Sequence, residues 1–563
     1  PICLSWASWF MRYAITMVLI ILMMPLSGIV SAENKTVDKD SFQTDSILES
    51  YSMPVKIAFD RVSNLESYTT EELHHSREWL VVTSIPISEH AMTYSKPISS
   101  KETGILPGSF VWELEGGAKP VERLSEALKI GEIESFSPLL ERIHHERYLP
   151  NDPELSSQWH LDNHGQTGGV SGEDANLTGA WDYYNGSGVV ISIVDDGLDI
   201  SHPDISPNYD QSASYDWCND DSDPTPLSFD GHGTAAAGVA AATGNNSLYV
   251  SGAAFGASIA GSNLISCSTS DYLESQALSY ENDYVDIYSN SWGPTDDGQR
   301  LGAPGPLMTA AFESDVYQGR DGLGNIITWA AGNGLASDDD SNYDGYANSR
   351  FTIAVTAITH QGEQSYYAEP GANILVAAHS NGDGESITTT DIVGSGGYNS
   401  SGNITDTFGG TSSATPLASG VIALMLEANQ NLTWRDVQHI LVNSARMNNQ
   451  SDPSWEVNGA GHDVSHKYGF GAVDAGAAVS MASSWTNVDE EVNLTIGPMV
   501  ENFQIDDGNS SWSEFNASIT MDMAIESIDV VVDISHNYRG NLEIVLVSPS
   551  GKESWLAEER SDN

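Results

Sequence analysis

The chain has 563 residues, which predicts several domains, and 40% of them are hydrophobic, enough to bury a substantial core. Its 78 acidic and 22 basic residues give a formal net charge of −56. Such a charge keeps a protein hydrated and argues against a nucleic-acid partner, because a face that binds phosphates needs clustered Lys and Arg. The same negative field would instead attract cationic peptides and calcium ions.

The N-terminal segment, residues 1–32, has the pattern of a secretory signal. We expect translation to start at Met11, followed by a short basic region at Arg12, an apolar stretch over Tyr13–Met24 and small residues for cleavage at Val30-Ser31-Ala32. This predicts a secreted or extracytoplasmic protein. A membrane anchor is the alternative only if residues 1–10 are translated, since the apolar stretch then lengthens.

Residues 33–147 form a polar region with an expected α+β fold. Leu124–Ile130 has the pattern of a short helix and Ile133–Ile143 that of an extended segment. A region of this size between a signal and a larger domain is most simply a pro-segment. An accessory domain that stays attached is the alternative.

Residues 148–486 alternate between strand and helix patterns. Val189–Val194 is a continuous apolar, β-branched run, as in a strand buried on both faces. Further strands and helices follow at Ile326–Ala331, Ile353–Thr359, Ile374–Ala378, Ala235–Ala242 and Leu417–Ala428, the last with Pro416 in its first turn. We therefore expect an α/β fold with a parallel sheet flanked by helices.

Residues 487–563 change to period-two alternation, which predicts an antiparallel β domain. Two alternating runs, separated by a turn, carry the pattern: Ile528, Val530, Val532 and Ile534, then Leu542, Ile544 and Leu546. These strands are too few to close a sandwich, so this domain is expected to be truncated at Asn563.

Three motifs carry the side chains of an acyl-transfer triad, in the order Asp195, His232 and Ser412. A serine hydroxyl is a poor nucleophile until a base removes its proton, and an aspartate can hold the histidine in the required tautomer. Asn333, in Ala330-Ala331-Gly332-Asn333-Gly334, can donate an amide N–H to the oxyanion, as can the backbone N–H of Ser412 at a helix start. Together these residues predict a serine endopeptidase.

The region from about Asp152 to Trp485 resembles the catalytic domain of the subtilases, specifically the kexin–furin branch of the proprotein convertases. The matching motifs are Val194-Asp195-Asp196-Gly197-Leu198, Asn290-Ser291-Trp292-Gly293-Pro294, Asp344-Gly345-Tyr346-Ala347-Asn348-Ser349, Asn431-Leu432-Thr433-Trp434-Arg435-Asp436 and Tyr468-Gly469-Phe470-Gly471. The segment that follows resembles the front half of the jelly-roll P domain, through Tyr538-Arg539-Gly540-Asn541-Leu542 and Leu546-Val547-Ser548-Pro549.

The resemblance implies a calcium-dependent endopeptidase that cuts peptides or proteins after Arg or Lys and is inhibited by its own pro-segment until that segment is removed. Substrate-binding residues follow by position: Asp296 and Asp344 at the primary pocket, Asp196 and Asp230 for the preceding residue, Glu274 further upstream, and Ser291 and Gly293 along the cleft. A carboxylate pocket favours Arg because bidentate pairing compensates its buried charge.

Two calcium sites are also implied, since hard oxygen donors suit this ion. The first site would use Asp152, Asp204 and Asn246, with main-chain carbonyls of Thr243, Leu248 and Val250. The second, beneath the primary pocket, would use Asp296, Asp339 and Glu369.

The chain departs from the family pattern in places that affect specificity. Ala235-Ala236 replaces Arg-Cys after the histidine motif, and Gly302 stands where many members carry a cleft carboxylate. The expected pro-segment cut follows Arg147, which is preceded by Glu146 rather than a basic residue. We therefore predict cleavage after a single Arg or Lys.

Two other functions remain open at this stage: a broad-specificity extracellular protease and an inactive binding protein on a protease scaffold. The three cysteines, Cys3, Cys218 and Cys267, lack metal-ligand spacing. The sequence permits a Cys218–Cys267 disulfide but does not decide it. Nor does it identify the physiological substrates, the glycosylation or the oligomeric state.

Overall fold

The computed structural model describes residues 46–52, 55–56, 59, 62–65, 68–85, 97–140, 149–498, 505, 512–519 and 523–560. The chain divides into two compact units, Pro1–His144 and His145–Asn563. The expected start at Met11, the signal and the junction at Arg147 lie outside the described residues. Over the ranges given above, no helix has both the length and the apolar character needed to cross a bilayer.

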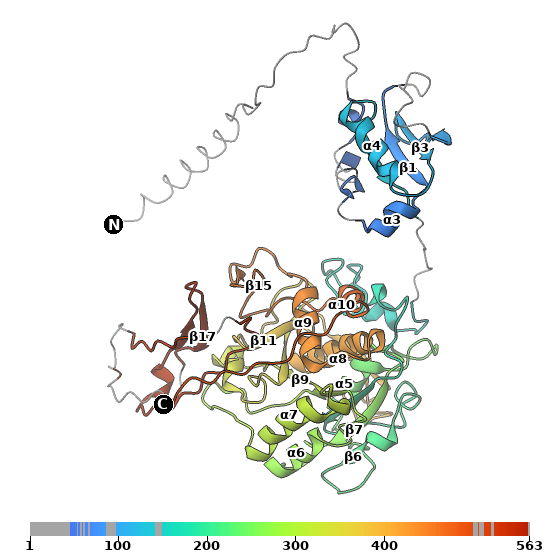
Figure 1. Ribbon diagram of the computed structural model, residues 1–563. Helices are drawn as coiled ribbons and strands as arrows, with labels where there is room; N and C mark the ends of the chain where they lie inside the picture. Colours follow the sequence, from blue (N-terminus) through green and yellow to red (C-terminus); the bar gives the residue numbers. More distant parts are fainter. Residues whose placement is uncertain are drawn as a thin grey trace, which may run out of the picture. The chain divides into compact units, whose positions relative to one another are not determined.

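The first unit contains a four-stranded antiparallel sheet in the order β2-β3-β1-β4 (Figure 1). Its strands and helices are β1 (Glu78–Val82), β2 (Ser99–Glu102), β3 (Ser109–Glu113), β4 (Ser135–Pro138), α3 (Thr70–His75) and α4 (Lys119–Lys129). Helix α4 starts with Pro120 in its first turn and buries Leu124 and Ala127 against Trp79 and Phe136. The unit is therefore α+β, as its sequence predicts.

The second unit is built on a seven-stranded sheet in the order β11-β10-β9-β8-β5-β7-β6, and all its pairings are parallel. The strands are β5 (Val190–Asp195), β6 (Tyr215–Asp216), β7 (Ser258–Asn263), β8 (Ile287–Asn290), β9 (Ile326–Ala330), β10 (Thr352–Ile358) and β11 (Ile374–His379). Every residue of β5 and β9 is buried, which explains their unbroken apolar runs. The predicted parallel α/β fold is confirmed.

Helices cover this sheet: α5 (His232–Ala241), α6 (Asp271–Leu278), α7 (Pro306–Gln318), α8 (Thr411–Ala428), α9 (Trp434–Ser444) and α10 (Ala475–Ala482). Figure 1 shows α6 and α7 side by side, and α8 runs along β8–β11. Helices α5 and α8 consist largely of small residues, which lets them approach closely. A Cβ on Gly420 of α8 would lie only 2.9 Å from the carbonyl oxygen of Ala240 in α5.

Smaller elements complete the structure. Three two-stranded sheets are formed by β12 (Ile387–Thr390) with β13 (Ile404–Phe408), β14 (Glu456–Val457) with β15 (Asp463–Val464), and β16 (Ile544–Val547) with β17 (Glu553–Ala557). The 3₁₀ turns are Leu48–Ser50, Leu155–Ser157, Leu177–Gly179, Gln211–Ala213, Arg320–Gly322, Leu335–Ser337, Ser341–Tyr343 and Arg539–Asn541. A disulfide joins Cys218 to Cys267, which the sequence only permitted.

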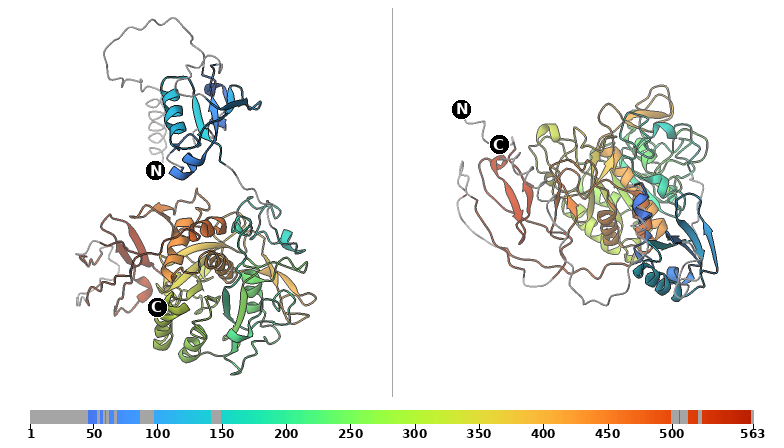
Figure 2. Two further views of the ribbon diagram at one scale, coloured as in Figure 1. Left: turned by 45° about the vertical axis from the view of Figure 1, so that its right-hand side comes forward. Right: turned by 90° about the horizontal axis from the view of Figure 1, so that it is seen from above.

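The C-terminal β region matches its prediction only in part. Figure 2 shows the antiparallel β16–β17 hairpin at one edge of the second unit. The predicted strand over 528–534 is absent, and Val530, Val531 and Val532 are exposed there. Alternation alone does not make a strand; a neighbouring strand must supply the hydrogen bonds, and no described segment pairs with this one.

Candidate active site

Asp195 and His232 form a hydrogen-bonded pair at the carboxyl edge of the parallel sheet. Asp195 is the last residue of β5 and is 1% exposed, and Nδ1 of His232 donates to its two oxygens at 2.9 and 3.0 Å. Burial lowers the pKa of His232, but the charge and hydrogen bond of Asp195, together with Asp196, raise it to about 9. The pair therefore fixes the imidazole tautomer and stabilises a charged imidazolium.

Asp196 holds the start of α5 in place. Its carboxylate accepts from the backbone N–H groups of His232 at 3.1 Å and Gly233 at 2.7 Å. A Cβ on Gly233 would lie 2.3 Å from the carbonyl oxygen of Gly197, so only glycine allows this approach. Burial and the neighbouring Asp195 raise the pKa of Asp196 to about 7. Predicted as a substrate residue, Asp196 also positions the base.

Ser412 is the second residue of α8 and lies half-buried. Gly410 precedes the helix with φ +76°, a conformation that L side chains rarely adopt, and this turn brings the backbone into the helix at Thr411. The Ser412 hydroxyl donates to the carbonyl oxygen of Ser291 at 3.3 Å and makes no hydrogen bond to His232. Catalytic contacts are often long before substrate binds and shorten in the complex with substrate.

Pro416 leaves a carbonyl free at the nucleophile. It is the sixth residue of α8 and lies in the second turn. The sequence-based expectation of a proline in the first turn was wrong. Proline has no N–H to donate to the residue four positions earlier, which is Ser412. The hydroxyl of Ser291 donates to that carbonyl oxygen at 3.1 Å. Ser291, predicted to line the cleft, thus supports the backbone of Ser412.

Asn333 is oriented by the backbone of α8. Its Oδ1 accepts from the backbone N–H of Thr411 at 2.8 Å and from the Thr411 hydroxyl at 3.1 Å. Because Oδ1 must be the acceptor here, the Nδ2 amide group is left as a donor. The main-chain N–H of Asn333 donates to Asp296 at 2.8 Å, which links this residue to the predicted primary pocket.

A pocket of about 320 Å³ brings several of these residues together. Its lining contains the predicted residues Ser412, Asn333, Asp344, Asp296, Ser291 and Gly293, and also Trp292, Pro294, Ala330, Gly332 and Thr411. Sequence reasoning did not assign these last five to the site. Trp292 carried a signal, because it stands within the matching motif Asn290-Ser291-Trp292-Gly293-Pro294.

Asp344 is a carboxylate of this pocket whose pKa is raised. Burial, followed by the charges of Asp296 and Asp339, raises its pKa to about 7. One of its oxygens accepts from the backbone N–H of Tyr346 at 2.8 Å, and a Cβ on Gly293 would lie 3.0 Å from the other. Gly293 therefore leaves space beside that oxygen for a ligand.

Glu274 and Asp230 do not line the pocket. Glu274 is 8% exposed, and its oxygens accept from the hydroxyls of Thr269 at 2.7 Å and Tyr346 at 2.9 Å. Tyr346 stacks on Trp329, with ring centroids 5.1 Å apart. Glu274 therefore braces the pocket wall through Tyr346, whereas Asp230 lies half-buried in the loop before α5.

The residues of the first predicted calcium site lie close together. Both Asp152 and Asp204 are buried. Burial and the charge of Asp204 raise the pKa of Asp152, and backbone hydrogen bonds offset part of this rise. Asp152 accepts from the backbone of Asn246 at 3.1 Å, and Asp204 accepts from the Asn246 side chain at 3.0 Å. The Asp204 carboxylate also accepts from the backbone N–H of Val250. Its main-chain carbonyl accepts from the backbone N–H of Thr243. Carboxylate, amide and carbonyl oxygens of this kind are the donors that calcium prefers, and this site stays a prediction.

The second predicted site also concentrates negative charge. Burial and the charges of Asp339 and Asp296 raise the pKa of Glu369 to about 9. A Cβ on Gly332 would lie 2.3 to 2.5 Å from the Glu369 carboxylate, so glycine is required there. Within the described ranges, however, no three acidic, histidine or cysteine side chains are arranged to share one metal ion. This site stays a prediction.

Comparison with known proteins identifies the family. Residues 186–471 match the subtilase family, and residues 525–563 match the proprotein convertase P-domain. The chain is 39% identical over 436 residues to PC3-like endoprotease variant B of Hydra vulgaris, covering 75% of this chain and 60% of that protein. It is 40% identical to proprotein convertase subtilisin/kexin type 6 of Homo sapiens and 38% identical to furin of Bos taurus, each over 73% of this chain.

The chain spans 43% and 51% of the lengths of these two relatives. Among solved structures, the serine protease of Aeromonas sobria matches with a TM-score of 0.63 and 26% identity, over 74% of this chain and 82% of that one. The complex of that protease with its chaperone also matches, with a TM-score of 0.63 and 25% identity. With the family match extending over just over half of its length, the chain belongs to the subtilase family.

Proposed function

We propose that this subtilase is a secreted, calcium-dependent serine endopeptidase that hydrolyses peptide bonds after Arg or Lys. One observation carries the proposal: a single pocket is lined by a serine nucleophile, an oriented amide donor and a perturbed carboxylate, namely Ser412, Asn333 and Asp344. The relatives support it, since they include proteins named furin and proprotein convertase.

The chemistry starts at Ser412. When substrate binds, its hydroxyl leaves the carbonyl of Ser291 and gives its proton to His232 as the oxygen attacks the scissile carbonyl. This step needs the neutral imidazole, which a pKa of about 9 makes the minor form near pH 7. The charge of Asp195 stabilises the imidazolium. Nδ2 of Asn333 and the backbone N–H of Ser412 donate to the oxyanion. The imidazolium protonates the leaving amine, and water then releases the acyl group by the same steps.

Specificity depends on the carboxylates of the pocket. A guanidinium or ammonium group beside Asp344 and Asp296 would neutralise charges that otherwise repel each other, whereas an apolar side chain would leave them unpaired. The pro-segment, residues 33–147, would act as an intramolecular inhibitor until cleavage after Arg147. Glu146 before that arginine supports a requirement for a single basic residue.

Calcium would be held by Asp152, Asp204 and Asn246, and by the carboxylates near Glu369. When bound, the ion supplies positive charge that cross-links loops and compensates buried carboxylates. It takes no part in the chemical steps.

The test compares peptide substrates ending in Arg, Lys, Leu and Phe, together with an arginyl phosphonate that labels active serine. We expect labelling and rapid Arg cleavage, both abolished in Ser412→Ala. In Asp344→Asn the kcat/KM for Arg should fall about 100-fold or more, because one partner of a buried charge pair is lost. Asp463→Asn, an exposed residue of β15, removes the same charge and should change nothing.

Two outcomes would contradict the proposed function and favour another one. Comparable rates on all four substrates, with no change of preference in Asp344→Asn, would make the protein a broad-specificity protease. Failure of the phosphonate to label the protein, together with no cleavage of any substrate, would make it a binding protein on a protease scaffold.

A further inference from the structure

The C-terminal segment touches the two loops that carry the predicted carboxylates of the primary pocket. Arg539 donates from Nη2 to the carbonyl oxygen of Gln299 at 2.8 Å, three residues after Asp296. Asn342, two residues before Asp344, donates from Nδ2 to the carbonyl oxygen of Trp555 at 3.4 Å. The segment therefore contacts the pocket loops from the outside.

Tyr343 makes the most complete of these contacts. It directly precedes Asp344 and is 5% exposed. Its hydroxyl donates to the carbonyl oxygen of Glu558 at 3.1 Å and accepts from the backbone N–H of the same residue at 3.0 Å. The guanidinium of Arg560 lies 4.3 Å from the centre of its ring. One side chain thus joins the end of β17 to the residue before the pocket carboxylate.

The backbone of Tyr343 extends this connection to the other loop. Its carbonyl oxygen accepts from the N–H of Gly302 at 2.9 Å, and the N–H of Gly345 donates to the carbonyl oxygen of Gly302 at 2.7 Å. Gly302 and Asp344 therefore pair as a short parallel bridge. Because the loop that ends at Gly302 carries Asp296, a shift of Tyr343 would move both pocket carboxylates relative to Ser412.

We propose that Tyr343 is a positioning residue for the primary specificity pocket, and that its hydroxyl holds the Asp344 loop to the backbone of Glu558. The inference rests on the proposed function and deepens it, because it names what sets the spacing of the pocket. That spacing matters since bidentate pairing with a guanidinium needs a defined carboxylate position, and a displacement of about 1 Å can cost about 100-fold.

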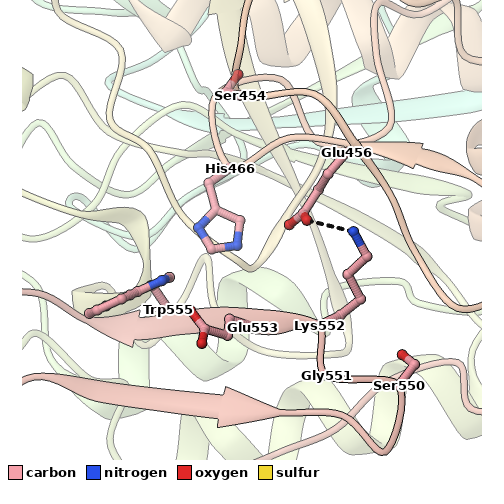
Figure 3. A pocket seen from close by; sticks show the side chains of 8 residues that line it. All are labelled: Ser454, Glu456, His466, Ser550, Gly551, Lys552, Glu553 and Trp555. Carbon is pink, nitrogen blue, oxygen red and sulfur yellow. Dashed lines mark hydrogen bonds and ion pairs between the residues drawn. The ribbon is translucent and has the colours of Figure 1, made fainter. Parts of the chain in front are cut away.

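The other side of the hairpin offers a matched control. Figure 3 shows Lys552, beside β17, paired with Glu456 across a pocket of about 450 Å³ that His466 and Trp555 also line. The Lys552–Glu456 distance is 3.0 Å, and both side chains are 45% exposed, so this ion pair contributes little. It joins the same hairpin to the β14 strand, which carries no pocket carboxylate.

The test uses Tyr343→Phe in the full chain after activation, with active sites titrated by the arginyl phosphonate. The variant keeps the ring beneath Arg560 and removes only the hydroxyl. We expect KM for the Arg substrate to rise about 5- to 10-fold with kcat changed less than about twofold, because the loss affects binding of the side chain and not the chemistry. Lys552→Gln should leave both constants unchanged.

The outcomes separate the two proposals. Unchanged KM in Tyr343→Phe, with or without a lower melting temperature, would show that the contact is merely structural and would overturn the positioning role. Wild-type protein that neither labels nor cleaves would overturn the proposed function instead. If Tyr343→Phe does not fold, Arg560→Met weakens the same contact, and an unchanged KM there would likewise overturn the inference.

Discussion

At the scale of single residues, Asn333 shows how one side chain can be both fixed and available. Its Oδ1 is held by Thr411, at the start of the helix that carries Ser412. Its main-chain N–H is held by Asp296. The nucleophile, the oxyanion donor and the primary pocket therefore share one small network, and the amide needs no rearrangement when charge develops.

Replacing Asn333 by Ala should lower kcat by about 100- to 1,000-fold, because one donor to the oxyanion is lost; this range is the one reported for such donors in subtilisin. KM should change little, since the contact strengthens only in the transition state. Active-site-titrated kinetics on an Arg amide substrate provide the measurement. Asn443→Ala, at an exposed position of α9, is the control, and an unaltered kcat in Asn333→Ala would remove Asn333 from the oxyanion site.

The motif residues could be named from sequence because each follows a recognisable strand or starts a helix. The supporting contacts could not. The hydroxyl of Ser291 donates to the Ser412 carbonyl because Pro416 leaves that carbonyl free. Ser291 and Ser412 lie 121 positions apart along the chain. The sequence placed Ser412 at a helix start, and the helix begins one residue earlier, at Thr411, so only the expected position of Pro416 in the first turn was wrong.

At the scale of elements, a cluster of buried histidines joins the segment before β5 to the ends of β10 and β11. His160, His360 and His379 pack around Trp159 with centroid distances of 5.7 to 6.2 Å. Both ring nitrogens of His160 are buried without a hydrogen-bond partner. His379 also faces Glu173, at 3.5 Å, with Arg446 and Asp174 nearby.

This cluster should make the second unit sensitive to acid. Burial and the neighbouring His379 lower the pKa of His160 to about 3, from 6.5 in the unfolded chain, and burial also lowers that of His379. Between pH 6.5 and about 3, His160 is protonated in the unfolded chain but stays neutral in the folded chain. The free energy of unfolding should therefore fall with pH, by about 1.4 kcal/mol per pH unit for one histidine.

His160→Phe keeps an aromatic ring against Trp159 and removes the titration. The readout is the difference in free energy of unfolding between variant and wild type from pH 7 to pH 5, because buried carboxylates with raised pKa values, such as Asp315, act in the opposite direction. The difference should grow in favour of the variant as pH falls. His164→Gln, at an exposed position, should follow wild type, and a constant difference for His160→Phe would rule out the cluster as the cause.

The elements that sequence predicted best are those whose burial is complete. Val190–Asp195 and Ile326–Ala330 are buried throughout, so hydrophobicity alone marks them. The run at 528–534 alternates just as clearly but has no paired strand among the described residues. Strand β17, which does pair, was not predicted, because Glu553–Ala557 carries only a weak alternation and its partner decides its conformation.

At the scale of the whole molecule, contacts between distant parts of the second unit carry no local sequence signal. The first compact unit ends at His144, close to the predicted end of the pro-segment at 147, and the second joins the catalytic and C-terminal β regions. Tyr343 and Glu558 lie 215 positions apart along the chain, and Arg435 and Glu526 pair at 2.6 Å. Such contacts follow from the fold and have no local signal.

The net charge of −56 makes the response to cations a property of the whole molecule. Sodium chloride should raise the melting temperature, because screening weakens the repulsion among carboxylates. Calcium should raise it further than magnesium at the same ionic strength, since only calcium tolerates an irregular set of carboxylate, amide and carbonyl oxygens such as that around Asp152 and Asp204.

Asp204→Asn separates the specific effect from the general one. The two oxygens of Asp204 accept from Asn246 and Val250, so the amide replacement keeps the size of the side chain but removes one charge of the site and one of these acceptors. Melting curves with a chelator, with calcium and with magnesium should show the extra calcium increment in wild type and most of it lost in the variant. Equal melting temperatures in calcium and magnesium for the wild type would mean that these carboxylates respond to ionic strength alone.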